Sequence, residues 1–172
     1  LGFIQQRDET LQADEESGRD AYLALVDRHP DSEFAAAAHM ALGEYFFDNH
    51  RIGDAISNYS KVVDLHAPDG QHYEKGLYKL AWSHYKLSSY DTCLELLAKL
   101  LDWSEENFQR SGKRSAMAPE AIEYTAISFS DLSDATGMDP VSVAKSFYSR
   151  TGERNYEPDV YERLADVLMQ QT

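Results

Sequence analysis

The chain reads LGEYFFDNHRIGDAISNY over residues 42–59, and this stretch decides the fold. A small residue, Gly43, is followed by the aromatic Phe46 and then by Ala55 and Tyr59. Small and large side chains at these offsets suit two antiparallel helices that approach each other closely, because residues three or four apart share one helix face. The stretch therefore predicts a helical hairpin.

The same pattern recurs further along the chain. Leu80-Ala81, His84, Cys93 and Leu97 repeat the offsets, and Ala81 lies 38 residues after Gly43. A repeat of this length indicates supersecondary units that bury their cores between neighbours and present an open surface. We therefore expect a binding scaffold rather than a catalyst.

The composition describes one folded domain with a sizeable core. The 172 residues are 42% hydrophobic and 27% charged, and the net charge is −14. A surface of that sign repels nucleic acid and anionic lipid, so neither is an expected partner. The single cysteine, Cys93, forms no internal disulfide, and no apolar run is long enough to span a membrane. Because the chain begins at Leu1 without methionine, we expect a piece of a longer protein.

Helical patterns come in pairs and strand patterns are lacking, which predicts an all-α fold of about seven to eight helices. Asp31 or Ser32 is expected to cap the second helix, and Asp139 the seventh. Residues 109–115 are expected to form an exposed loop. The expected helices cover about 14–28, the segment from the cap to Asn49, 52–65, 71–87, 90–101 with a possible extension through Phe108, 119–132, 140–150 and 156–170.

Taken together, these offsets resemble the tetratricopeptide repeat family. Residues 36–69 match its motif best, and residues 74–107 match it with His84 in place of an aromatic residue. The third unit fits only if six extra residues lengthen the turn between its helices. The expected units of this single domain are 1–35 (partial), 36–73, 74–117, 118–156 and 157–172 (partial).

The resemblance implies a right-handed α-solenoid of antiparallel hairpins. Residues 30–35, Pro-Asp-Ser-Glu-Phe-Ala, are similar to a junction common in bacterial envelope repeat proteins. Those relatives include the periplasmic coordinator of the Tol–Pal system and the repeat lipoprotein of outer-membrane assembly. The resemblance therefore implies a periplasmic or cell-envelope location, which the composition by itself leaves unknown.

In this family the concave face of the superhelix binds a peptide or protein partner. The resemblance thus implies a non-catalytic scaffold for protein–protein interaction. Carried over residue by residue, the candidate partner-binding positions are Met40, Glu44, Phe47, Lys75, Tyr78, Trp82, Tyr85, Lys86, Glu123 and Ile127.

Tyr78, Trp82 and Tyr85 form one stripe along a helix, and two interpretations of it stay open. The stripe could pack against the next hairpin, as aromatic stripes usually do. Alternatively, it could anchor a peptide with apolar and some acidic side chains, flanked by Lys75 and Lys86. A different function also stays open, in which the chain spaces or oligomerises a larger repeat protein and self-associates through open terminal helices.

Catalytic and metal-binding motifs are lacking in the sequence, so we predict no enzyme activity, no cofactor and no metal. Cys93 is expected to be a buried small residue rather than a reactive thiol. His39 and His84 occupy positions between helices and are expected to pack there. A zinc site built on His66 and His72 is a minor alternative.

Overall fold

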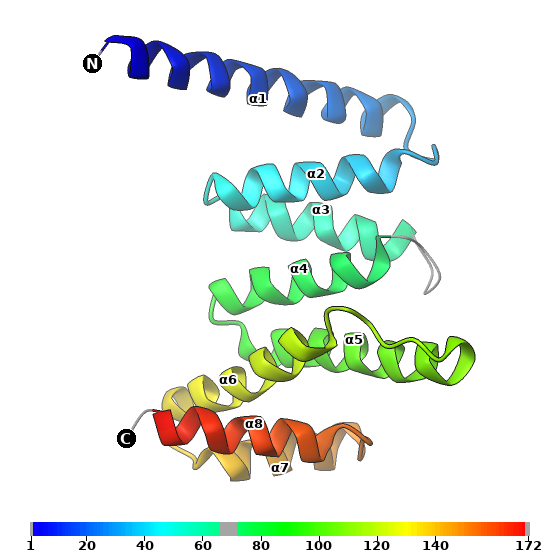
Figure 1. Ribbon diagram of the computed structural model, residues 1–172, viewed down its shortest axis with the longest axis vertical. Coiled ribbons are helices and arrows are strands. Elements are labelled where there is room, and N and C mark those ends of the chain that lie inside the picture. The colour runs from blue at the N-terminus through cyan, green and yellow to red at the C-terminus, as the bar shows by residue number, and fades with distance from the viewer. Residues whose placement is uncertain (1, 66–71, 171–172) are drawn as a thin grey trace. The chain divides into compact units, whose positions relative to one another are not determined.

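The computed structural model describes residues 2–65 and 72–170, with side chains from residue 14 onward. In these residues it has eight helices and no strand, which confirms the all-α prediction (Figure 1). None of the helices described is both long enough and apolar enough to cross a bilayer. The chain divides into two compact units, residues 1–73 and 74–172, and each is described by itself.

The first unit contains α1 (Gly2–Arg28), α2 (Ala35–Asp48) and α3 (Ile52–Leu65). Helix α2 packs against both α1 and α3. The C-terminal end of α2 and both ends of α3 agree with the sequence prediction. Helix α1 begins much earlier than the predicted residue 14, because residues 2–13 continue the helix without the apolar periodicity on which the prediction relied.

Helices α2 and α3 meet at Gly43 and Tyr59. The Tyr59 ring is fully buried, and a Cβ atom added to Gly43 would lie 2.4 Å from one of its carbons. Only a residue without a side chain allows this approach. Nearby, His39 Nδ1 and Asn58 Oδ1 are 2.9 Å apart, which ties the same two helices and confirms that His39 packs between them.

The contact between α1 and α2 is partly polar. Arg19 donates to the Tyr45 hydroxyl at 3.2 Å and lies over the Tyr45 ring. Tyr22 of α1 is 43% exposed. The predicted cap of α2 is also wrong: Phe34 precedes the helix, and no side chain caps it, because a turn of backbone hydrogen bonds from Ser32 leads into α2.

The second unit contains α4 (Tyr73–Lys86), α5 (Tyr90–Ser111), α6 (Ala118–Thr136), α7 (Pro140–Thr151) and α8 (Glu157–Gln170). Helix α4 begins at the last residue of the first unit. Helix α6 packs against α5, α7 and α8 and is therefore central to this unit (Figure 1). Its Phe129 is fully buried and meets the rings of Phe147 and Tyr148 from α7 edge-on.

The turn between α2 and α3 is a helix C-terminal motif with a left-handed residue. The amide of Arg51 donates to the carbonyl of Phe46 at 2.8 Å, and His50 has φ of 58°. The Asn49 side chain donates to the Tyr45 carbonyl at 2.8 Å. The Asn49 side chain therefore caps the C-terminus of α2, while His50 contributes its backbone conformation.

The turn between α4 and α5 has the same geometry. The Ser89 amide donates to the His84 carbonyl at 2.9 Å, and Ser88 has φ of 55°. Each of these residues lies 38 positions after its counterpart in the α2–α3 turn. The two turns thus differ in sequence but share a left-handed residue and the same backbone hydrogen bond.

Two predicted boundaries in the second unit were wrong. Helix α5 runs through Ser111 and ends at Gly112, so the loop that follows is 112–117 rather than 109–115. The six extra residues of the third predicted unit do not lengthen its turn, which is only 137–139. Five of the six extend α6, which has 19 residues where α2 and α4 have 14.

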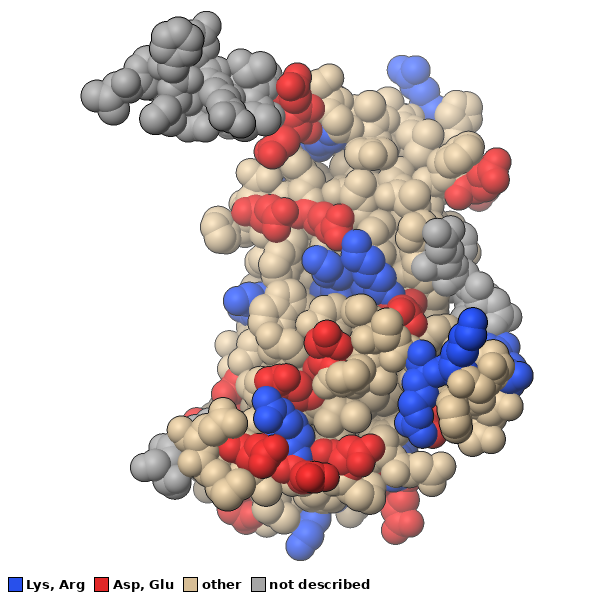
Figure 2. All heavy atoms as spheres, viewed as in Figure 1, with Lys and Arg blue, Asp and Glu red and all other residues tan. Residues whose placement is uncertain are grey.

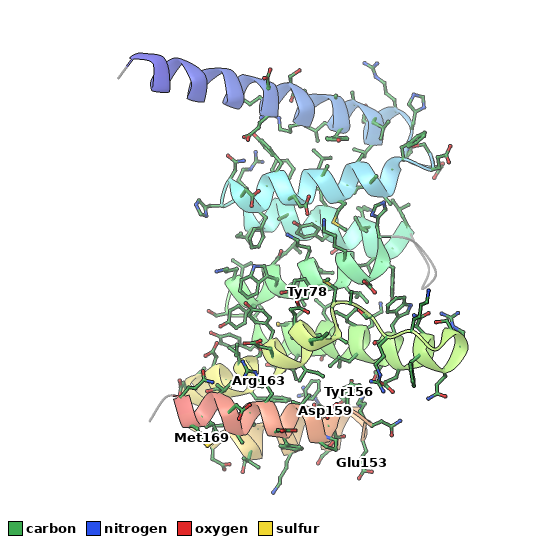
Figure 3. The ribbon with its side chains drawn as sticks, viewed as in Figure 1. Tyr78, Glu153, Tyr156, Asp159, Arg163 and Met169 are labelled. Atoms are coloured by element: carbon green, nitrogen blue, oxygen red, sulfur yellow. The ribbon has the colours of Figure 1, made fainter. Side chains whose placement is uncertain are left out.

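A polar cluster fixes the connection between α7 and α8 against α5. Arg154 donates to both carboxylate oxygens of Asp102 at 3.3 Å, and the Tyr156 hydroxyl donates to the same carboxylate at 2.9 Å. Tyr156 is buried, and burial, with Asp102 next in importance, raises the pKa of its phenol. Tyr156 is labelled in Figure 3, at the start of α8.

Candidate binding surface

Five aromatic side chains of the second unit lie together and define what we call the aromatic cluster. They come from three helices: Tyr78, Trp82 and Tyr85 from α4, Tyr90 from α5 and Tyr124 from α6. All five are half-buried. The cluster therefore both packs helices together and leaves part of its rings in contact with solvent.

Ring geometry within the cluster is specific. Trp82 and Tyr85 are stacked, with centroids 5.2 Å apart and planes 7° from parallel. The Tyr124 ring meets both of them edge-on, 4.4 Å from Trp82 and 5.7 Å from Tyr85. Tyr78 contacts Tyr124 at 6.4 Å. Such offset and edge-to-face pairs each add about 0.5–1.5 kcal/mol to the free energy gained by burial, so the rings hold one another in place.

Polar partners lie on both sides of the stacked pair. The Tyr85 hydroxyl donates to Asp131 of α6 at 2.8 Å, which raises the pKa of Tyr85 further above the value that burial alone gives. The Lys86 ammonium lies 4.7 Å from the Trp82 ring centroid, within the range of a cation–π contact. Trp82 is thus positioned by Tyr85 and Lys86 of its own helix and by Tyr124 of α6.

Charges of opposite sign border the aromatic cluster. Helix α4 contributes Lys75, Lys79 and Lys86, and helix α6 contributes Glu120 and Glu123. Figure 2 shows basic side chains over α4, and acidic ones over α6 and α8.

The carboxylates Glu120 and Glu123 of α6 influence the pKa of Tyr78. The pKa of Tyr78 is raised mainly by burial, and further by the neighbouring Tyr124, Glu120 and Glu123. Glu123 also accepts a hydrogen bond from Arg163 of α8 at 2.6 Å. Tyr78 and Arg163 are labelled in Figure 3. Glu123 of α6 therefore links the aromatic cluster to α8.

The structure joins only some of the predicted binding residues. Tyr78, Trp82 and Tyr85 come together as expected, with Lys86 on Trp82, and Glu123 lies beside Tyr78. Of the other predicted members, Lys75 is exposed on α4 and Ile127 is half-buried on α6.

The predicted members from the first unit need one correction. Glu44 and Phe47 are half-buried on α2. Met40 is only 5% exposed, so its side chain belongs to the hydrophobic core and offers almost no surface to a partner. The prediction failed for Met40 because the motif position sets a helix face but not how fully that face is covered.

Two members of the aromatic cluster, Tyr90 and Tyr124, were not predicted. Both lie outside the positions that the repeat motif assigns to a concave face. Tyr90 begins the expected helix that follows α4, and Tyr124 lies in the expected helix after that one. A search for aromatic residues on these two helices would have identified both as candidate neighbours of α4. The sequence signal for the cluster was therefore present, but it was distributed over three helices.

The remaining candidate groups fit structural roles. Cys93 is buried, its sulfur lies 3.7 Å from Ser128 Oγ, and burial raises the pKa of its thiol to about 11. Burial lowers the pKa of His84, which is half-buried. Across the residues with described side chains, no group of three His, Cys, Asp or Glu could hold a metal ion. His66, one half of the suggested zinc pair, lies outside the described residues.

No protein-family model matches this sequence, and no curated protein matches it.

Proposed function

We propose that this chain is a divergent tetratricopeptide-type scaffold that binds a peptide segment of a protein partner at the aromatic cluster. The observation that carries the proposal is the half-buried Trp82–Tyr85 stack with Lys86 over the Trp82 ring. Rigid aromatic rings that keep part of their surface in water are the usual energetic anchors of protein interfaces. No catalytic role is proposed for any residue.

The internal repeat supports the scaffold part of the proposal. Helices α2 and α4 begin 38 residues apart, at Ala35 and Tyr73, and α3 and α5 also begin 38 residues apart, at Ile52 and Tyr90. The turns between them share one geometry. Equivalent hairpins that repeat along a chain are typical of α-solenoids, and we propose a right-handed one here.

The charge pattern supports a particular kind of peptide. Apolar side chains would lie on Trp82 and Tyr85, and acidic side chains would lie beside Lys75 and Lys86. The carboxylates of α6 would favour a basic residue on the opposite border.

The test is a peptide selected from a random displayed library against the whole chain. Trp82 and Trp103 are the two tryptophans, so a Trp103→Phe background leaves Trp82 as the single reporter. Binding at the aromatic cluster should change Trp82 fluorescence. Replacing Trp82 and Tyr85 by alanine removes that reporter, so binding of this variant is measured by the anisotropy of a fluorescein-labelled copy of the peptide. The replacement should weaken binding at least about a hundredfold, since hot-spot aromatic residues each contribute about 2 kcal/mol or more.

The matched control removes two exposed aromatic residues elsewhere, Tyr22→Ala with Phe34→Ala, both in the first unit. That variant should bind the peptide as the parent does. Because Tyr85 also contacts Asp131, circular dichroism must show that the test variant stays helical. Lys86→Glu, which replaces an exposed side chain, provides a second test and should weaken the binding of an acidic peptide. Unchanged affinity in both folded variants would exclude the aromatic cluster as the site.

A second function, a structural spacer, is favoured by one observation. Four of the five ring contacts are between α4 and either α5 or α6, so the cluster also serves as packing. In that case no selected peptide would depend on Trp82, and the Trp82→Ala, Tyr85→Ala variant would lose stability rather than affinity. Unfolding and binding curves measured on the same variant separate the two functions.

A further inference from the structure

A second charged surface lies at the far end of α5, away from the aromatic cluster. Helix α5 has 22 residues and α4 has 14, so α5 is about 12 Å longer at 1.5 Å per residue. Figure 1 shows the end of α5 running beyond α4, with the loop 112–117 returning from it. We call Phe108, Arg110, Lys113 and Arg114 the basic tip.

The basic tip differs in charge from the rest of the chain. Residues 105–115 contain three of the sixteen Lys and Arg residues and two carboxylates, Glu105 and Glu106, so this stretch has a net charge of 3 − 2 = +1 although the net charge of the chain is −14. All three cations are exposed, and Figure 2 shows basic side chains gathered at this end of α5. Cations near a helix C-terminus also stabilise the helix, but Lys113 and Arg114 follow the helix end.

Local hydrogen bonds hold the basic tip in a defined shape. Gly112 ends the helix with φ of 72°, and the Asn107 side chain donates to the Lys113 carbonyl at 2.7 Å. The Arg114 guanidinium lies 4.7 Å from the Phe108 ring centroid and pairs with Glu105. Phe108 is nevertheless 39% exposed. The surface therefore offers an ordered aromatic ring among cations rather than a freely moving charged loop.

We propose that the basic tip docks an acidic peptide segment that carries an aromatic or other apolar side chain. The charges are complementary, and Phe108 gives the apolar residue a contact surface. A narrow peptide touches the tip alone. An anionic membrane is a broad surface that would also face acidic side chains close to the tip, such as the exposed Glu106, which lies one helical turn before Arg110 and therefore within the screening length of about 8 Å at physiological salt.

The probe is a short fluorescein-labelled peptide rich in glutamate with one phenylalanine, measured by anisotropy with the whole chain. The same peptide with glutamine in place of glutamate serves as its control. The pair of substitutions Arg110→Glu and Lys113→Glu should weaken binding about tenfold or more and reduce its salt dependence. Arg114 is left unchanged because it packs on Phe108.

The matched variant is Lys61→Glu with Lys145→Glu, which changes two exposed lysines on α3 and α7 and gives the same net charge. It should bind the glutamate peptide within about twofold of the parent. Equal loss in both variants, or equal binding of the glutamine peptide, would overturn the proposal. Binding to phosphatidylserine vesicles without binding to the peptide would also overturn it. The Trp82→Ala, Tyr85→Ala variant should retain this binding, so the two proposed surfaces fail or succeed separately.

Discussion

The contact between Gly43 and Tyr59 leaves no space for one more methyl group. A Cβ at residue 43 would lie 2.4 Å from a ring that is itself fully buried and therefore has no free direction in which to move. We predict that Gly43→Ala destabilises the chain by about 1–3 kcal/mol, the usual cost of overpacking a core. Urea unfolding followed by circular dichroism measures the change.

Gly53 provides the control, since it lies in α3 with nothing within 4 Å of an added Cβ. Gly53→Ala should leave stability unchanged or raise it by about 0.5–1 kcal/mol, because alanine favours a helix. Equal effects of the two substitutions would contradict the close approach of α2 and α3.

The buried thiol of Cys93 should make the stability of the folded chain depend on pH under alkaline conditions. Burial raises its pKa from 9.0 to about 11, so the folded chain keeps a proton that the unfolded chain releases. The resulting stabilisation is complete below about pH 9 and is lost as pH rises through about 11, an effect of about 2–3 kcal/mol. Unfolding free energies measured at about pH 8 and about pH 11 should differ accordingly.

Cys93→Ala separates this contribution from that of other groups. Burial also raises the pKa values of Tyr59, Tyr148 and Tyr156, so their effects have the same sign. The alanine variant should still lose stability at high pH, but less than the parent. An identical loss in the two chains would show that Cys93 is not buried as described.

At the scale of single elements, Asp139 begins α7. Its carboxylate accepts a hydrogen bond from the Ser142 amide at 2.9 Å, which confirms the predicted cap and lowers the pKa of Asp139. The contribution is therefore present above about pH 4 and is lost as pH falls further. We predict that Asp139→Ala lowers the thermal midpoint at pH 7 and not at about pH 2.

Asn is the matched substitution, because its amide oxygen can accept the same hydrogen bond without titrating. Asp139→Asn should retain most of the midpoint at both pH values. A loss as large as that of Asp139→Ala would indicate that the charge, rather than the cap, stabilises the start of α7.

The ends of most elements could be predicted from local chemistry. Pro140 and Asp139 mark the start of α7, and the polar turns near Asn49 and Ser88 separate the hairpins. Prediction failed where local signals are weak. The first half of α1 has no apolar stripe, and α2 begins after Phe34 through backbone hydrogen bonds that any sequence can make.

The candidate site could be predicted only along one helix. Spacing places Tyr78, Trp82 and Tyr85 on one stripe of α4, and the structure confirms that they lie together. The approach of Tyr90 and Tyr124 depends on how α5 and α6 cross α4, which the period of a single helix does not contain. How deeply Met40 is buried likewise depends on how the neighbouring helices pack against α2.

At the scale of the whole molecule, the aromatic cluster and the contacts of Asp102 are all internal to residues 74–172. We predict that a fragment of residues 74–172 folds alone and keeps the near-ultraviolet circular dichroism of its aromatic rings. Nuclear magnetic resonance spectra of the fragment and of the whole chain check this. A fragment that is helical but lacks dispersed side-chain signals would contradict it.

The paired fit of Gly43 and Tyr59 also constrains the order in which this protein can change. The equivalent positions 38 residues later hold Ala81 and Leu97, both buried, so one extra methyl group there accompanies a smaller partner. A path from the first pair to the second must reduce Tyr59 before it enlarges Gly43, since the opposite order passes through an overpacked core. The two substitutions are thus tolerated when Tyr59 changes first and harmful when Gly43 changes first.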